Sequence, residues 1–271
     1  MRLKKYKKLE LMKKPQVYLN LFFNMLFVSF LSFALVGCSK SSDDDTEIIE
    51  EVYEEKEEEE EEGEESIICS DGILYSEKDG IIRVEAESVI AENDWVRSST
   101  ISGFGGIGYL LWSKQNNFSS PGDGIIRYSI KISNPGTYQF VWRSRITEGT
   151  GNTDHNDNWL RIPTASDFYA EKNNGDVVYP RGSGKTPFPE GAGRNGWFKV
   201  YMNTVGRWFW YSKTSDNDPH DIFARFDTAG TYDIEISGRS VSHAIDQFVL
   251  FKTDKNLQIA QNAALSEIVC K

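Results

Sequence analysis

The distribution of hydrophobic and polar positions divides the chain into three parts. Residues 1–18 carry several lysines, and residues 19–36 then run almost without charge as LNLFFNMLFVSFLSFALV. Residues 46–66 contain the run EEKEEEEEEGEE, which offers little apolar surface to bury. From residue 67 onward, short runs rich in β-branched and aromatic residues alternate with Gly, Asn, Asp and Pro. This pattern predicts a leader over residues 1–37, a disordered acidic tether over residues 38–66 and one folded domain over residues 67–271.

The folded part shows the two-residue period of β-strands. Tyr138, Phe140 and Trp142 share one face of a run, as do Tyr232, Ile234 and Ile236 in a second run. Candidate strands cover residues 81–89, 108–113, 125–132, 137–144, 158–162, 197–201, 207–211, 221–227, 231–237 and 243–252. The only helix expected is short and lies within residues 256–268. The predicted fold class is all-β, a β-sandwich of the jelly-roll type.

Two connections between the candidate strands are long, at residues 147–156 and 170–196. The second contains six of the 22 glycines of the chain. Binding residues usually lie on long loops of a rigid sandwich, so we expect the ligand site on these loops.

The net charge of −11 is spread unevenly. Residues 1–37 hold seven basic residues and one acid, and residues 39–66 hold sixteen acids and two lysines. The remaining 24 acids and 21 bases leave a nearly neutral domain. Nucleic-acid-binding domains carry a basic excess, so we do not expect a nucleic-acid partner.

The leader fits either a transmembrane helix or a signal peptide. Leu35-Val36-Gly37-Cys38 resembles the bacterial lipobox, in which the cysteine is lipidated and becomes the new N-terminus. A signal peptide or anchor with a chance cysteine is the alternative. The acidic cluster that follows Cys38 resembles the export signal of Bacteroidetes surface lipoproteins. These resemblances imply a protein held at the outer membrane by its lipid and facing the cell exterior.

Cys69 and Cys270 lie at the two ends of the folded domain. Domain termini are often close together, and an extracytoplasmic compartment permits disulfides. We therefore expect a Cys69–Cys270 bridge, with two free thiols as the alternative.

Glu85 and Glu87 are two positions apart on a predicted strand and so point to one face. They form either a solvent-exposed pair or, with Asp246 from the last strand, a calcium site. Asp246 lies in an otherwise apolar strand and needs a partner, which is either a metal or a salt bridge.

Several segments together resemble carbohydrate-binding modules of families 6 and 35 and their malectin-like relatives. They are VEAES at 84–88, GDGIIRYSIKI at 122–132, NPGTYQFVWRSR at 134–145, the Trp208 and Trp210 strand, AGTYDIEISGRS at 229–240 and AIDQFVLF at 244–251. The resemblance implies a jelly roll with a structural calcium ion held by Glu85, Glu87 and Asp246. It also implies polysaccharide or oligosaccharide binding at loops along one edge, and a role beside other surface glycan-uptake proteins. The domain is longer than the typical module, mainly around residues 170–196.

A sugar ring offers an apolar face to aromatic side chains and a rim of hydroxyl groups to polar ones. The aromatic candidates are Tyr109, Trp112, Trp208 and Trp210, each of which can equally be a core residue. The polar candidates are Asn158, Asp218, His220 and His243. Two Asx-rich segments, 154–159 and 216–221, supply most of them, and such segments also form plain turns or bind a second calcium ion.

The sequence favours a binding protein over an enzyme. The three histidines lack zinc-ligand spacing, and no Gly-x-Ser-x-Gly motif is present. We therefore name no catalytic residue. The alternatives are a jelly-roll polysaccharide lyase or hydrolase and a protein-binding adhesion module.

Overall fold

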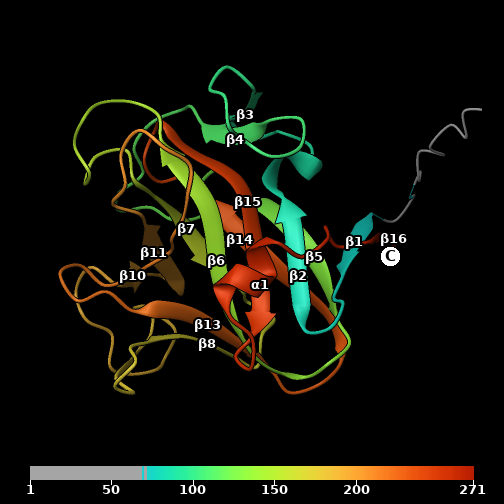
Figure 1. The fold of residues 1–271 in the computed structure, drawn as a ribbon. Helices are drawn as coiled ribbons and strands as arrows, with labels where there is room; N and C mark the ends of the chain where they lie inside the picture. The colour runs from blue at the N-terminus through green and yellow to red at the C-terminus, as the bar shows by residue number, and fades with distance from the viewer. Residues whose placement is uncertain (1–68, 70–71) are drawn as a thin grey trace, which may run out of the picture. The chain divides into compact units, whose positions relative to one another are not determined.

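The computed structural model describes Cys69 and residues 72–271, which form two β-sheets packed face to face (Figure 1). Consecutive strands cross repeatedly from one sheet to the other, as β5 to β6 and then β6 to β7 do. This is the all-β jelly-roll sandwich that the sequence predicts. The expected signal peptide, the lipidated Cys38 and the acidic tether lie outside the described residues.

One sheet has seven strands. In spatial order they are β10 (Gly193–Arg194), β11 (Trp197–Tyr201), β7 (Asp157–Arg161), β14 (Gly230–Ser237), β5 (Ile126–Ile132), β1 (Ile73–Ser76) and β16 (Ile268–Cys270). β1 pairs with β5 in parallel, and the other pairs are antiparallel. Figure 1 shows β10 and β11 at the left of the view and β1 and β16 at the right.

The second sheet has nine strands. Its main path runs β3 (Trp95–Ser98), β4 (Tyr109–Trp112), β15 (His243–Lys252), β6 (Gly136–Ile146), β13 (Asp221–Phe226), β8 (Asp167–Glu171) and β9 (Val177–Val178). β2 (Ile81–Glu85) pairs with β15, and β12 (Phe209–Trp210) pairs with β6. A short 3₁₀ helix, Ala86–Ser88, follows β2.

The core lies between the sheets and is rich in aromatic side chains. Tyr138, Phe140 and Trp142 are fully buried in it, which confirms the predicted inward face of β6. The second predicted face also points inward, although Tyr232 retains slight exposure. The helix α1 (Leu257–Gln261) covers a separate apolar cluster on the outer face of the nine-stranded sheet.

The strand predictions hold best where the apolar pattern is strong. β11 and β15 have the predicted bounds, and the other candidates match within a few residues. Short strands that carry polar residues, such as β3, β8 and β10, were not predicted. The expected helix over 256–268 is only partly present, because α1 ends early and the chain continues into β16.

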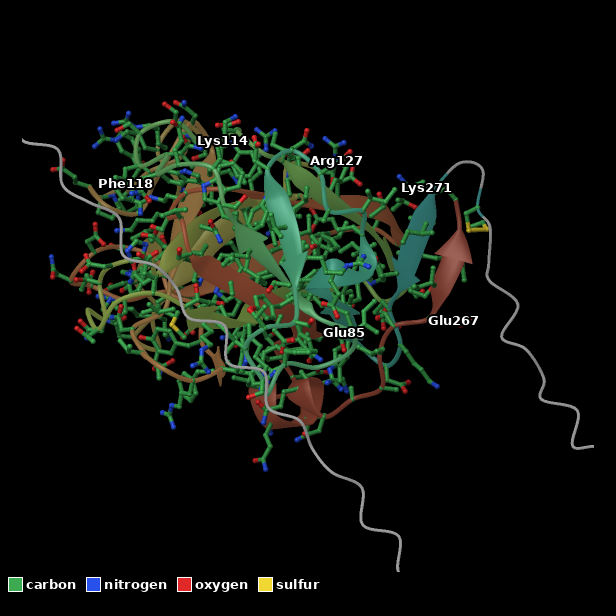
Figure 2. The ribbon with its side chains drawn as sticks, turned by 90° about the horizontal axis from the view of Figure 1, so that it is seen from above. Glu85, Lys114, Phe118, Arg127, Glu267 and Lys271 are labelled. Carbon is green, nitrogen blue, oxygen red and sulfur yellow. A yellow bond between two sulfur atoms is a disulfide. The ribbon has the colours of Figure 1, made fainter. Side chains whose placement is uncertain are left out.

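A disulfide joins Cys69 to Cys270, as the sequence predicts. It ties the first described residue to the end of β16, so both ends of the domain lie together. In Figure 2 this bond and Lys271 are at one end of the molecule, and Phe118 is at the opposite end. Among the described residues, no helix is long and apolar enough to span a membrane.

Candidate functional site

A cavity of about 720 Å³ opens where β7 begins and β11 ends, and we call it the main cavity. Its walls come from the β6–β7 loop at 153–157, from β11 and its continuation, from the β12–β13 loop and from two further connections. The side chains that line it include Phe118, Asp154, His155, Tyr201, Tyr211 and Arg239. Loops far apart in the sequence therefore meet at the end of the domain opposite the disulfide (Figure 2).

The two Asx-rich segments found in the sequence lie on this one cavity. Asp154 and Asn156 come from the first segment, and Asp216 and Asn217 come from the second. The amide of Asn156 donates to the carbonyl of Met202 at 2.9 Å, which fastens the β6–β7 loop to the chain after β11. These segments are thus more than local turns, because both line one shared space.

An aromatic ring and a guanidinium group form a second wall. Phe118 is 54% exposed, which is high for a phenylalanine, and the Arg239 guanidinium lies 4.9 Å from its ring centroid. Arg239 also stacks on Trp159 at 5.0 Å and pairs with the buried Asp157. Packing on both sides fixes the guanidinium, so Arg239 and Phe118 form a combined polar and aromatic surface.

The polar groups of the cavity can exchange hydrogen bonds with hydroxyl groups. His155 Nδ1 lies 2.7 Å from the carbonyl oxygen of Val241. Since a carbonyl only accepts, Nδ1 carries the proton, and Nε2 is an acceptor in the neutral ring. Burial, with the neighbouring Tyr211 and acidic groups, raises the pKa of Tyr201 to about 12, so its phenol stays protonated at neutral pH.

Two of the predicted sugar platforms belong instead to a buried cluster. Tyr109 and Trp208 pack with ring centroids 4.9 Å apart, and Trp208 Nε1 donates to the Ser102 carbonyl at 3.1 Å. Trp112 is fully buried against Trp95. The prediction that Tyr109, Trp112 and Trp208 contact sugar is wrong for this structure, because their burial leaves no ring face for a glycan.

Trp210 is half-buried in the apolar cluster beneath α1 and does not line the main cavity. Its alternation with Phe209 placed it correctly on one face of the strand. However, that face is covered by the C-terminal helix. The prediction that Trp210 contacts sugar is not tested by this structure, which leaves the residue partly exposed.

The predicted polar residues fall into two pairs. Asn158 and His243 are fully buried, 2.9 Å apart between Asn158 Nδ2 and His243 Nδ1, and Asn158 accepts a bond from the Arg239 backbone. Burial lowers the pKa of His243 to about 3, so the ring is neutral. This pair holds the backbone of Arg239 in place, and neither side chain lines the main cavity.

Asp218 and His220 line a different, more open depression next to Lys172. His220 is buried and bonds to the Asp218 carbonyl, whereas Asp218 pairs with Lys172 at 2.8 Å. They are close in sequence to residues that line the main cavity, but they do not line it themselves.

Sequence reasoning missed Phe118, Tyr201, Tyr211, Lys199 and Arg239 as site residues. Phe118 offered a usable signal, because an aromatic residue in the polar stretch NNFSSPGDG has no strand face to bury. Tyr201 and Lys199 share one face of β11, yet the sequence did not show that this face borders a cavity.

Three acidic side chains surround the loop of residues 105–108. Glu87 Oε1 accepts from the backbone of Ile107 and Gly108, both at 3.1 Å, and Asp246 Oδ1 accepts from Gly105 at 2.8 Å. Glu85 Oε1 accepts from Gln247 at 2.7 Å. The second carboxylate oxygen, Oε2, of both Glu85 and Glu87 is buried and has no hydrogen-bond partner among the described residues.

Burial raises the pKa of all three carboxyl groups, and the charge of Asp246 also raises the pKa of Glu85 and of Glu87. The pKa of Glu87 reaches about 7, first through burial and then through the charges of Glu85 and Asp246. Burial is the main cause for Glu85 and Asp246 as well. Asp246 forms a salt bridge with Arg143, which is one of the two partners that the sequence left open.

The negative charge of Glu85 and Glu87 suits a hard cation, because carboxylate oxygens without partners carry it. In the described residues, however, no three Asp, Glu, His or Cys side chains converge as a ready-made metal-binding group. Gly106 adopts a left-handed φ of 56°, and a Cβ there would lie 2.7 Å from Glu87 Oε1. The loop can therefore approach Glu87 this closely only with glycine at that position.

No protein-family model and no curated protein matches this chain. Solved structures similar to it include two family 35 carbohydrate-binding modules. The module from Clostridium thermocellum is 14% identical, with 64% of this chain and 98% of that chain covered and a TM-score of 0.37. The module from Cellvibrio japonicus is 13% identical, with 70% and 96% covered and a TM-score of 0.36.

A third similar structure is the GH26-CBM35 β-(1,4)-mannanase of Podospora anserina. It is 17% identical, with 66% of this chain covered and a TM-score of 0.38, but this chain spans only 29% of the mannanase. Family 35 is one of the two families that the sequence motifs resemble. Since the three TM-scores are below 0.5, we argue function from the residues of this chain alone.

Proposed function

We propose that this chain is a non-catalytic polysaccharide-binding protein and that the main cavity is its ligand site. The observation that supports this most strongly is the convergence of an exposed aromatic ring with hydroxyl-binding groups. Phe118 presents an apolar face, and Asp154, His155 and Tyr211 offer acceptors and donors around it. Small polar and aromatic groups in a concave space are what binding of a sugar chain requires.

The position of the cavity agrees with a surface-anchored protein. The described chain enters the domain at Cys69, and Phe118 lies at the opposite end (Figure 2). A lipid on Cys38 and the acidic tether would hold the domain at the outer membrane with the cavity directed outward. Other surface glycan-uptake proteins would then receive the captured chain.

A structural calcium ion is part of the proposal. Glu85, Glu87 and Asp246, which do not converge as a ready-made group, would have to close around it, and the ion would neutralise carboxylates that are buried and partly without partners. This cluster lies on the loop that packs beside Trp208 and apart from the main cavity. Its proposed role is therefore stability rather than direct contact with sugar.

Affinity electrophoresis of the full-length chain in a non-ionic detergent, against neutral and anionic plant and algal polysaccharides, tests this function. We expect at least one polysaccharide to retard the wild type. Phe118→Ala should lose most of that retardation. Leu265→Ala is the control, because Leu265 is also an exposed apolar side chain but lines a separate depression outside the main cavity.

The same mixtures are assayed for unsaturated and reducing chain ends. Retardation without new ends supports a binding protein, and new ends would identify a lyase or hydrolase. Equal losses in Phe118→Ala and Leu265→Ala would place the ligand elsewhere. Absence of both retardation and new ends would favour the adhesion alternative.

A further inference from the structure

A smaller cavity of about 250 Å³ adjoins the main cavity, and we call it the side cavity. The two share four lining residues, Phe118, Lys199, Asp216 and Arg239. They therefore lie side by side across these four side chains, and we call the two cavities together the groove. A polymer that lies on Phe118 in the main cavity would extend directly into the side cavity.

The side cavity is built mostly by the glycine-rich connection of residues 170–196. Arg181, Glu190, Gly191, Gly193 and Arg194 all come from it. Gly191 has a φ of 82°, and a Cβ there would lie 2.4 Å from Asp216 Oδ2. Glycine at this position thus lets the connection close against the wall that the two cavities share.

The two ends of the groove differ in charge. Asp154, Asp157 and Asp216 outnumber Lys199 and Arg239 around the main cavity. In the side cavity, Arg181, Arg194, Lys199 and Arg239 outnumber Glu190 and Asp216. A chain that carries 11 more acidic than basic residues therefore concentrates cationic groups at one place.

Two of these cations have no neutralising partner within the described residues. Lys199 pairs with Asp216, and Arg239 pairs with Asp157, so their charges are largely balanced. Arg194 donates instead to the neutral carbonyl of Ser119 at 2.9 Å, and Arg181 lies over the ring of Phe188. The guanidinium groups of Arg181 and Arg194 are exposed and can bind an anion.

The backbone brings these two arginines onto neighbouring segments. Gly196 N donates to the carbonyl of Arg181 at 2.9 Å, two residues after Arg194. The bond from Arg194 to Ser119 also directs its side chain toward the loop that carries Phe118. An anion bound in the side cavity would therefore lie near two positive charges that no carboxylate of the described residues neutralises.

We propose that the side cavity binds the acid group of an anionic polysaccharide, whose neighbouring sugar ring stacks on Phe118. This inference rests on the proposed function and adds the class of ligand. Arg181 and Arg194 bind the carboxylate or sulfate, and Asp154 and His155 of the main cavity bind hydroxyl groups. The near-neutral domain thus selects charged glycans through one local group of arginines.

The test compares matched polymers in affinity electrophoresis with the full-length chain. Polygalacturonate is paired with its carboxyl-reduced product, and a sulfated galactan is paired with its desulfated product. We expect stronger retardation by the charged member of at least one pair, and the pair identifies the acid group. Raising NaCl from about 50 to 500 mM should weaken this retardation, because salt screens the exposed arginines.

Arg181→Gln/Arg194→Gln should weaken binding of the charged polymer about tenfold, since charge-assisted hydrogen bonds are lost, and leave binding of its neutral product unchanged. Arg207→Gln/Arg225→Gln is the control. It removes the same charge from exposed arginines outside both cavities. Thermal melting verifies that both double variants fold.

Equal retardation by the charged and neutral members of both pairs would overturn this inference and leave the proposed function standing. Equal weakening by the two double variants would show attraction to net charge alone. Binding of inorganic polyphosphate as strong as that of the charged polysaccharide would show the same. Binding of no polysaccharide in any arm would instead refute the proposed function itself.

Discussion

Two aromatic regions of this domain are chemically alike but differ in what they leave exposed. Around Trp208, the indole N–H is bonded to Ser102, one ring face packs on Tyr109, and Arg143 lies 5.8 Å from the ring. Around Phe118, the ring is more than half exposed, and polar groups of the main cavity surround it. The Trp208 ring and its N–H group already have partners within the protein. The Phe118 ring still has a surface that a ligand can contact.

The acidic cluster belongs to the first region. Arg143 joins Trp208 to Asp246, and Gly105 joins Asp246 to the loop that also bonds Glu87. We therefore expect changes in the Trp208 region to alter stability and changes around Phe118 to alter ligand affinity. Variants in each of the two regions test that division.

Trp208→Ala should lower the free energy of unfolding by about 3 kcal/mol, because it removes a large buried ring and leaves a cavity. Chemical denaturation measures this change. Glycan affinity of the folded variant should match that of the wild type. Normal stability together with lost affinity would instead make Trp208 a sugar platform, as the sequence first suggested.

Phe118→Ala should weaken glycan binding about tenfold, since an exposed aromatic anchor is removed from the centre of the site. The free energy of unfolding should change by less than about 0.5 kcal/mol, because the ring is exposed. Isothermal titration with the retained glycan and a denaturation curve measure the two quantities. A large loss of stability with intact affinity would erase the contrast between the regions.

Glu87→Gln should stabilise the calcium-free chain at pH 8 by about 1 kcal/mol and abolish the rise in melting temperature on calcium addition. The pKa of Glu87 is raised from 4.5 to about 7, first by burial. The folded state therefore holds this proton more tightly, and wild-type stability falls as pH rises from about 4.5 through 7.

The calcium-free wild type should accordingly lose melting temperature between pH 5 and pH 8 relative to Glu87→Gln, as differential scanning fluorimetry in a chelator can measure. Equal calcium-induced shifts in both proteins would exclude Glu87 as a ligand. The absence of any shift in the wild type would remove the calcium site from the proposal.

Asp154→Ala should weaken glycan binding by a factor of about three, the effect of losing one exposed hydroxyl acceptor. Asp227→Ala is the control, because Asp227 is exposed on a loop outside the main cavity. Titration of both variants with the same glycan provides the comparison. A loss in the control that equals the loss in Asp154→Ala would argue for a general charge effect.

The fold followed from the sequence because it depends on local alternation. β6 and β14 turn every second side chain toward the core, and that pattern is visible in the sequence without knowledge of their partners. β10 and β3 escaped prediction because they are short and are held by pairing with a stronger neighbour. The disulfide followed from the compartment and from the usual closeness of domain termini.

The site was only partly predictable, because it depends on which loops meet. The Asx-rich segments were identified from composition, and both contribute to the main cavity. The choice among the aromatic residues failed, since burial of Trp208 depends on Tyr109 and Ser102, which are about 100 positions away. Arg239 required knowledge of its contacts with Phe118 and Asp157, which the sequence does not show.

Protein-observed NMR, with a saturating amount of the retained glycan, tests the central claim most directly. The account predicts amide shift changes concentrated at Phe118, at residues 153–157 and at Asp216, with little change at Tyr109 and Trp208. Shift changes centred on Tyr109 and Trp208, with an unperturbed main cavity, would contradict it.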